Sequence, residues 1–270
     1  MDINIVVLKI ILGATQGITE WLPISSQGII LFINSLFNFD SKSLEEIFAI
    51  SLALHLGTSF SAIFTYRKKL TQLLQNGLKN RNSNKESIFY LFSTMISLFI
   101  SFPIYLLIPS LSSNVELLGV LGMIIIGFVY IINGAIQWFG KSVNISANNQ
   151  YTFFNALIVG VFQGISIIPG MSRSGLTISA LLLTKFDKSE ALNISFILSI
   201  PVTIIAGIMG IYILSNDIYI NLLAIFVAFA VGIATIRVLV KFTESVNFYN
   251  FILFIGFTLV FGGSVYLFYQ

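Results

Sequence analysis

Apolar residues run through most of this chain in stretches long enough to cross a lipid bilayer as helices. Six such stretches are uninterrupted, at about 47–66, 88–108, 115–139, 190–214, 218–240 and 248–268. Two others, at about 3–37 and 151–184, are broken by proline, glycine and serine. We interpret each broken stretch as a re-entrant hairpin of two half-helices, because irregular backbone at membrane depth needs cover from protein or water. The alternative for each is a single kinked helix.

An internal repeat with a period of 147 residues relates the two broken stretches. Gly13, Gln16, Gly17, Ile18, Ser25 and Gly28 recur without a gap as Gly160, Gln163, Gly164, Ile165, Ser172 and Gly175. The charged residue differs, since the first copy carries Glu20 and the second carries Arg173. Three spans separate the copies, and an odd number gives the hairpins opposite orientations. The sequence therefore predicts an all-α integral membrane protein with six transmembrane helices and two re-entrant hairpins, arranged as inverted-topology repeats.

The two repeats cover about 1–140 and 151–270, and we expect the whole chain, 1–270, to form one polytopic membrane domain. Composition agrees, because 56% of the residues are hydrophobic and only 9% are charged, against roughly 25% charged in soluble domains. No alternation typical of a membrane β-barrel is present. We expect no nucleic-acid partner.

Cysteine and histidine content excludes several chemistries. The chain has no cysteine, so disulfides, thiol catalysis and cysteine-bound metals are excluded. His55 is the single histidine. One histidine excludes metal clusters of several histidines and the acid-phosphatase pattern of other lipid phosphatases.

Charge distribution predicts the orientation in the cell membrane. Residues 67–87 carry six basic side chains and only one acidic one, Glu86, which places this segment in the cytoplasm. Threading outward from it puts both termini outside, with the first hairpin entering from the exterior and the second from the cytoplasm. We expect the site to open toward the exterior. The start, Met1-Asp2, lacks the basic region of a cleavable signal, so we expect it to be retained.

The first hairpin carries an acidic pair followed by two serines. Gln16 and Glu20 are four residues apart, so on a helix they share a face. A carboxylate at membrane depth must be neutralised, pair with a cation or bind a metal. With the Gln16 amide it suits a hard divalent ion, Mg²⁺ or Ca²⁺; a protonated, purely structural Glu20 is the alternative. Ser25 and Ser26 lie at the turn as candidate nucleophiles.

The second hairpin is built around Arg173. Burial of an arginine requires an anion nearby, and its planar fork suits phosphate oxygens. A structural ion pair between Arg173 and Glu20 is the alternative. Close backbone approach, hydroxyl donors and the N-terminus of the following half-helix, expected at 175–184, favour a phosphate site. Its candidate residues are Ser25, Gly170, Ser172, Arg173, Ser174 and Thr177.

Together the hairpins supply what phosphoryl transfer needs, which is positioning and charge stabilisation. A substrate that reaches such a site from the bilayer is a lipid phosphate or diphosphate. A polyprenyl-phosphate transporter or flippase with the same arginine is the main alternative, because inverted repeats with broken helices also describe many carriers. A structural scaffold leaves Glu20 and Arg173 unexplained.

The strings QGITEWLPISSQG (16–28) and PGMSRSGLT (169–177) closely resemble the signature motifs of undecaprenyl-diphosphate phosphatases, the bacitracin-resistance (BacA/UppP) family. The resemblance covers the whole chain in length, hydropathy and placement of both motifs. It implies a membrane enzyme that hydrolyses undecaprenyl diphosphate to the monophosphate and inorganic phosphate, recycling the lipid carrier for cell-wall or glycan assembly. It further implies that Ser26 is the nucleophile, that Arg173 holds phosphate, and that Gln16 and Glu20 bind divalent metal and activate the chemistry.

Two positions depart from the family pattern. Ile29 stands where many members have a histidine, and Gln16 stands where many have glutamate. If its helix packs against the first hairpin, His55 can serve as an auxiliary base; otherwise it is a hydrogen-bonded structural residue and Glu20 activates Ser26. The sequence leaves open the prenyl chain length, the metal, attack by Ser26 or water, the envelope type and the oligomeric state, for which a homodimer is one option.

Overall fold

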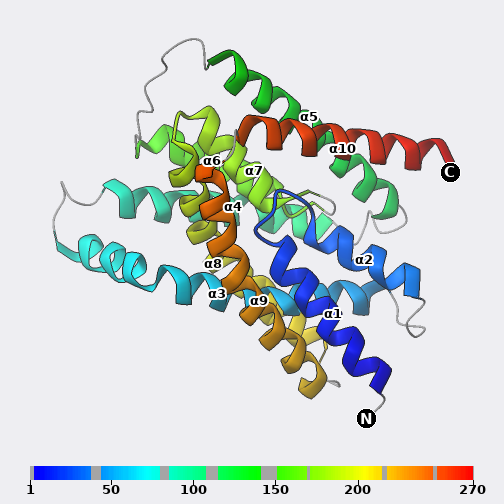
Figure 1. Cartoon of the computed structure of the whole chain (residues 1–270). Coiled ribbons are helices and arrows are strands. Elements are labelled where there is room, and N and C mark those ends of the chain that lie inside the picture. Colours follow the sequence, from blue (N-terminus) through cyan, green and yellow to red (C-terminus); the bar gives the residue numbers. More distant parts are fainter. Residues whose placement is uncertain are drawn as a thin grey trace. The chain divides into compact units, whose positions relative to one another are not determined.

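The computed structural model describes residues 3–37, 44–79, 85–107, 115–140, 151–168, 171–214, 218–245 and 248–269, and all their regular secondary structure is helical. The helices, shown in Figure 1, are α1 (Ile3–Thr19), α2 (Ser26–Phe37), α3 (Leu44–Lys79), α4 (Lys85–Leu107), α5 (Val115–Gly140), α6 (Phe153–Ile165), α7 (Arg173–Leu183), α8 (Lys188–Ile213), α9 (Ile218–Ser245) and α10 (Phe248–Tyr269).

Five of these helices contain apolar segments long enough to cross a membrane, namely α3, α4, α8, α9 and α10. They coincide with five of the six uninterrupted spans that the sequence predicts. The remaining span lies in α5, a helix of 26 residues whose described apolar stretch is Met123–Ile132. An all-α membrane protein is thereby confirmed, while the count of six spans stays a prediction.

Both interrupted stretches consist of two helices rather than one kinked helix. The first forms α1 and α2 and the second forms α6 and α7 (Figure 1). Within each pair the helices contact one another. The predicted division into half-helices is therefore confirmed.

The chain divides into two compact units, and each draws on both halves of the sequence. The first unit comprises Met1–Leu70 and Ser199–Leu239, and the second comprises Thr71–Leu198 and Val240–Gln270. The core of the first unit combines buried residues of α1, α2, α3 and α9: Leu12, Ile30, Ile47, Ile50, Leu54, Ala224 and Ile225.

Glycines allow α1 to pack closely on α9 in the first unit. A Cβ atom on Gly13 would overlap the carbonyl oxygen of Ala224, and one on Gly17 would lie 2.9 Å from the carbonyl oxygen of Ala228. Small residues that let backbones approach are typical of helix packing in membranes.

The second unit repeats this packing with α6 and α4. A Cβ atom on Gly160 would lie 2.8 Å from the Ser93 carbonyl oxygen, and one on Gly164 would lie 2.9 Å from that of Ser97. Gly160 and Gly164 are the repeat equivalents of the two glycines on α1. The first hairpin therefore packs on α9 and the second on α4. Each of these is the second long helix after the other hairpin.

α3 is longer than the predicted span of about 47–66. The predicted span ends near residue 66, but the helix continues to Lys79, so Arg67, Lys68 and Lys69 lie on the helix rather than in a loop. Its 36 residues extend about 54 Å, well beyond a hydrocarbon core of about 30 Å. Arginine and lysine are good helix formers, and water can cover their charges beyond the bilayer.

Candidate active site

The first hairpin brings Gln16 and Glu20 together at the end of α1. The Glu20 amide donates to the Gln16 carbonyl at 3.0 Å, so the helical turn is completed and both side chains share a face, as the spacing predicts. The Gln16 Nε2 donates to the Glu20 Oε2 at 2.8 Å. Both residues are buried.

Ser25 and Ser26 occupy the start of α2. The Ser25 hydroxyl accepts from the amide of Gly28 at 3.2 Å, as a helix N-cap does. Ser26, the first helical residue, donates its hydroxyl to the Glu20 Oε2 at 3.2 Å. An oxygen at this position faces the positive end of the α2 dipole, which favours developing negative charge.

His55 reaches the same carboxylate from α3. Its Nε2 lies 3.4 Å from the Glu20 Oε2, and its Nδ1 lies 2.7 Å from the Ser51 carbonyl oxygen. A carbonyl only accepts, so Nδ1 carries a hydrogen and Nε2 faces Glu20. The condition set by the sequence, that this helix packs against the first hairpin, is met.

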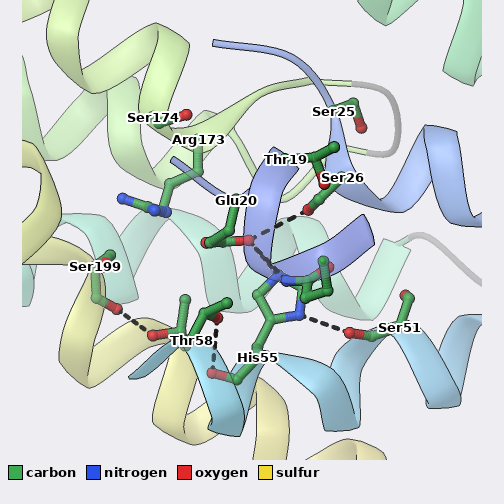
Figure 2. Close-up of polar contacts among 12 residues, drawn as sticks. Thr19, Glu20, Ser25, Ser26, Ser51, His55, Thr58, Arg173, Ser174 and Ser199 are labelled. Carbon is green, nitrogen blue, oxygen red and sulfur yellow. Dashed lines mark hydrogen bonds and ion pairs between the residues drawn. The ribbon is translucent and has the colours of Figure 1, made fainter. Parts of the chain in front are cut away.

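One carboxylate oxygen thus contacts the Ser26 hydroxyl, the Gln16 amide and the His55 imidazole. Figure 2 shows Ser26 and His55 directed at Glu20 from α2 and α3. Chemically, Glu20 can accept a proton from Ser26 and share it with His55, which is the usual arrangement of a nucleophile, a base and a group that orients the base.

The side-chain oxygen atoms of Glu20 and Gln16 also suit a hard divalent cation. The Gln16 Oε1 is buried and has no hydrogen-bond partner among the described residues. Those residues hold no group of three or more His, Cys, Asp or Glu side chains placed to bind a metal. Mg²⁺ commonly uses one or two carboxylates together with water and substrate phosphates, so Glu20 and Gln16 fit such an ion and a cage made of protein alone is not required.

The second hairpin begins its helix two residues earlier than expected, at Arg173, because Ser172 caps it. The Ser172 hydroxyl accepts from the amide of Gly175 at 3.1 Å and lies 3.2 Å from the Ser174 hydroxyl. Ser172 is the repeat equivalent of Ser25, and both serines cap through the equivalent glycine. Ser26 and Arg173 consequently occupy the same first helical position in their hairpins.

Arg173 is held by α8. Its Nη1 donates to the Ser195 carbonyl oxygen at 3.1 Å. The Thr177 hydroxyl donates to the Arg173 carbonyl at 2.8 Å and lies 2.5 Å from the Ser195 hydroxyl. Thr177 thus braces the first turn of α7, whereas Gly170 lies outside the described residues.

Ser195 is not among the site residues predicted from the sequence. The signal available in the sequence was a polar stripe in an apolar helix, since Ser195, Ser199 and Thr203 recur every four residues. In the structure these side chains of α8 are 0%, 0% and 3% exposed. Such a stripe marks a helix face turned toward protein rather than lipid. Residues that support Arg173 were to be expected on that face.

Two features define the class of this protein: helices that suit a bilayer, and the polar side chains of a buried Glu20 and a half-buried Arg173 at the breaks between helices. They are typical of polytopic membrane proteins whose polar site is built from discontinuous helices. The sequence comparisons narrow this class further. The family described as Bacitracin resistance protein BacA matches residues 9–263. The chain therefore belongs to the BacA family.

Relatives named undecaprenyl-diphosphatase extend over nearly the whole chain. The protein of Methanococcoides burtonii is 35% identical over 258 residues, which cover 92% of this chain and 94% of the relative. That of Haloarcula marismortui is 30% identical, over 91% and 93% of the two chains. That of Thermosipho melanesiensis is 31% identical, over 95% and 99%.

Proposed function

We propose that this protein is a membrane phosphatase that hydrolyses undecaprenyl diphosphate to undecaprenyl phosphate and inorganic phosphate, recycling the lipid carrier. The observation that carries the proposal is the buried Ser26 hydroxyl on the Glu20 carboxylate, with His55 on the same oxygen. Relatives that span nearly the whole chain are named for this hydrolysis.

In the proposed reaction the Ser26 oxygen attacks the terminal phosphorus while its proton passes to Glu20. The bond from this phosphorus to the bridging oxygen breaks, and its electron pair leaves with the polyprenyl monophosphate. Water then attacks the phosphoserine, releases inorganic phosphate and restores the serine hydroxyl. Direct attack by water, with Glu20 as base, is the alternative for the first step. His55 shares the proton that Glu20 accepts.

We propose that the polar groups of both hairpins act on the same diphosphate. The Arg173 guanidinium can bind two phosphate oxygens at once. Hydroxyls of Ser25, Ser172 and Ser174, with the first amides of α7, add donors for the remaining oxygens. Donors fixed in advance lower the cost of the charge that develops in the transition state.

A divalent cation, Mg²⁺ or Ca²⁺, is part of the proposal. Glu20 and Gln16 would hold it, and when bound it would offset negative charge on the phosphates. Supporting this is the buried amide oxygen of Gln16, which has no partner among the described residues. We expect a chelator to abolish phosphate release and added Mg²⁺ to restore it.

The topology predicted from charge belongs to the same proposal. The hairpins are re-entrant and inverted, both termini face outward, and the site opens to the exterior of the cell membrane. Three helices, α3, α4 and α5, separate the hairpins, as this arrangement requires. A transporter is not supported by the names of the relatives, and its test is stoichiometric, since an enzyme releases phosphate in detergent without any gradient.

The first prediction concerns phosphate release from undecaprenyl diphosphate by the purified protein. We expect Ser26→Ala and Glu20→Gln each to lower kcat by about 10²–10⁴-fold, the range for removing a positioned proton acceptor or its partner. Arg173→Lys should lower kcat/KM by about 10²-fold, because an ammonium cannot form the bidentate fork. Colorimetric phosphate measurement gives all three values.

Ser101→Ala is the matched control, because this buried serine of α4 bonds only its own helix, at the Leu98 carbonyl, in the described part of the chain. It should keep wild-type activity. Phosphate release that survives both Ser26→Ala and Glu20→Gln contradicts the assigned roles. A wild-type protein that binds the lipid but releases no phosphate contradicts the proposed function itself.

A further inference from the structure

A tyrosine from α5 covers the first turn of α7. Tyr130 is 2% exposed, and a Cβ atom on Gly175 would overlap its hydroxyl and lie 2.6 Å from its Cζ. The absence of a side chain at Gly175 is therefore what lets the phenol reach the helix N-terminus. Both residues belong to the second unit.

The Tyr130 hydroxyl is buried without a hydrogen-bond partner among the described residues. It lies near the Ser172 side chain, because a Cβ atom on Gly175 would meet both the Tyr130 hydroxyl and, at 3.2 Å, the Cβ of Ser172. A buried hydroxyl with no partner is destabilising, and phenylalanine would fill the same space without this cost. A tyrosine at this position is therefore best explained by a hydrogen bond that its hydroxyl forms when substrate is bound.

Ser172 provides that partner once an anion is bound. Its oxygen already accepts from the Gly175 amide and can accept one further hydrogen bond. Its hydroxyl also lies 3.2 Å from the Ser174 hydroxyl, and either of the two can be the donor. If the Ser172 hydrogen turns to a phosphate oxygen, the second acceptor position of Ser172 is open to the Tyr130 hydroxyl.

We propose that Tyr130 is a positioning residue for phosphate binding, which donates to the Ser172 oxygen and thereby directs the Ser172 hydroxyl at a phosphate of the substrate. The chain of donors runs from Tyr130 through Ser172 to the anion at the N-terminus of α7. Each hydrogen bond in such a chain polarises the next one. The inference rests on the proposed function, because it names a contact of the same phosphate site.

Tyr130→Phe tests this role by removing one oxygen. We expect KM for undecaprenyl diphosphate to rise about 5-fold, the effect of one neutral hydrogen bond, with kcat within about 2-fold of wild type. Ser172→Ala should also raise KM, and the double variant should be no worse than Ser172→Ala, since Tyr130 acts only through Ser172. A merely structural role would lower the melting temperature and act additively.

Tyr90→Phe is the matched control, because it removes a hydroxyl from another buried tyrosine of the same unit; its KM should stay at the wild-type value. An unchanged KM in Tyr130→Phe, or additive effects with Ser172→Ala, overturns the inference.

A binding experiment with inorganic phosphate separates this inference from the proposed function. Binding is measured as the rise in the melting temperature of the protein in detergent. Tyr130→Phe and Ser172→Ala should weaken this binding alike. If the wild type releases no phosphate but shows this pattern, the hydrolase proposal fails and the role of Tyr130 stands. If phosphate stabilises the wild type and Tyr130→Phe equally, or stabilises neither, the role of Tyr130 is refuted.

Discussion

Three polar side chains converge on the buried carboxyl group of Glu20. The Gln16 amide, the Ser26 hydroxyl and the His55 imidazole all lie within 2.8–3.4 Å of its Oε2. A buried charge is tolerated only when it is paired and hydrogen-bonded. The same contacts direct the oxygen at a hydroxyl that the carboxylate can activate.

The role of His55 is testable at this scale. We expect His55→Ala to lower kcat about 10–100-fold with little change in KM, because Glu20 loses the group that shares its proton while the phosphate contacts are intact. Steady-state phosphate release provides both constants. A lowered kcat would mean that a histidine from α3 serves in place of the one absent at Ile29.

Thr235→Val is a suitable control for that experiment. It removes one partly buried hydroxyl of the same unit, which bonds the Val231 carbonyl in its own helix. A wild-type kcat in His55→Ala would leave the histidine with a structural role only.

Single side chains were predictable where helical spacing alone decides the contact. Gln16 and Glu20 meet because residues four apart share a face, and serines before a helix are strong capping signals. Tyr130 was not predictable, since a tyrosine in an apolar helix has the same pattern whether it faces lipid or protein. Only its overlap with a Cβ on Gly175 reveals the contact.

At the scale of elements, the two hairpins are the same device used twice. Each has a serine cap that accepts from the equivalent glycine amide and a glycine-lined first helix packed closely on a long helix. The common backbone presents a hydroxyl in one copy and a guanidinium in the other. The two copies therefore share the serine cap and differ in the side chain that follows it.

The glycine faces make a paired prediction. Gly17→Ala and Gly164→Ala should each destabilise the protein by about 1–3 kcal/mol, because the new methyl group meets backbone that cannot move aside. Thermal unfolding in detergent measures this as a lower melting temperature. The two equivalent positions should respond alike.

Gly262→Ala is the control for this pair, because a Cβ atom there has no neighbour within 4 Å in the described part of the chain. A melting temperature of Gly17→Ala or Gly164→Ala equal to that of the control would contradict close packing at that helix. Gain of helix propensity alone would raise all three values.

The breaks between half-helices were predictable, but two helix boundaries were not. Proline, glycine and serine in an apolar run identify the turns, whereas α7 begins at Arg173 because the Ser172 side chain satisfies the first turn. α3 continues through its basic residues to Lys79, since charge ends a transmembrane span without ending a helix.

For the whole molecule, the basic residues near the end of α3 set the expected orientation. Arg67, Lys68 and Lys69 follow an apolar segment and lie on the continuing helix. A cluster of positive charge beside a span is retained in the cytoplasm. The first hairpin would then enter from the exterior.

Because the chain has no cysteine, single-cysteine variants can test this orientation. We expect Lys42→Cys to react with a membrane-impermeant maleimide in intact cells, and Lys79→Cys to react only after permeabilisation. The opposite pattern would reverse the orientation and with it the side to which the site opens.

Class and segment order were predictable for the whole molecule from hydropathy and the internal repeat. The division into units was not, because each unit takes its hairpin from one half of the chain and a packing helix from the other. One sequence contains no record of which distant helices touch. Small residues such as Gly13 and Gly160 indicate a close contact between helices, but they do not identify the partner helix.

That exchange of helices has a consequence for biosynthesis. About 200 residues separate Gly13 from the Ala224 backbone that it packs against, and a ribosome adding 5–20 residues per second needs roughly 10–40 s to cover them. During this interval the earliest hairpin has been made while its packing surface has not. In nascent chains released before α9 is made, the first hairpin should therefore be exposed to membrane quality-control proteases.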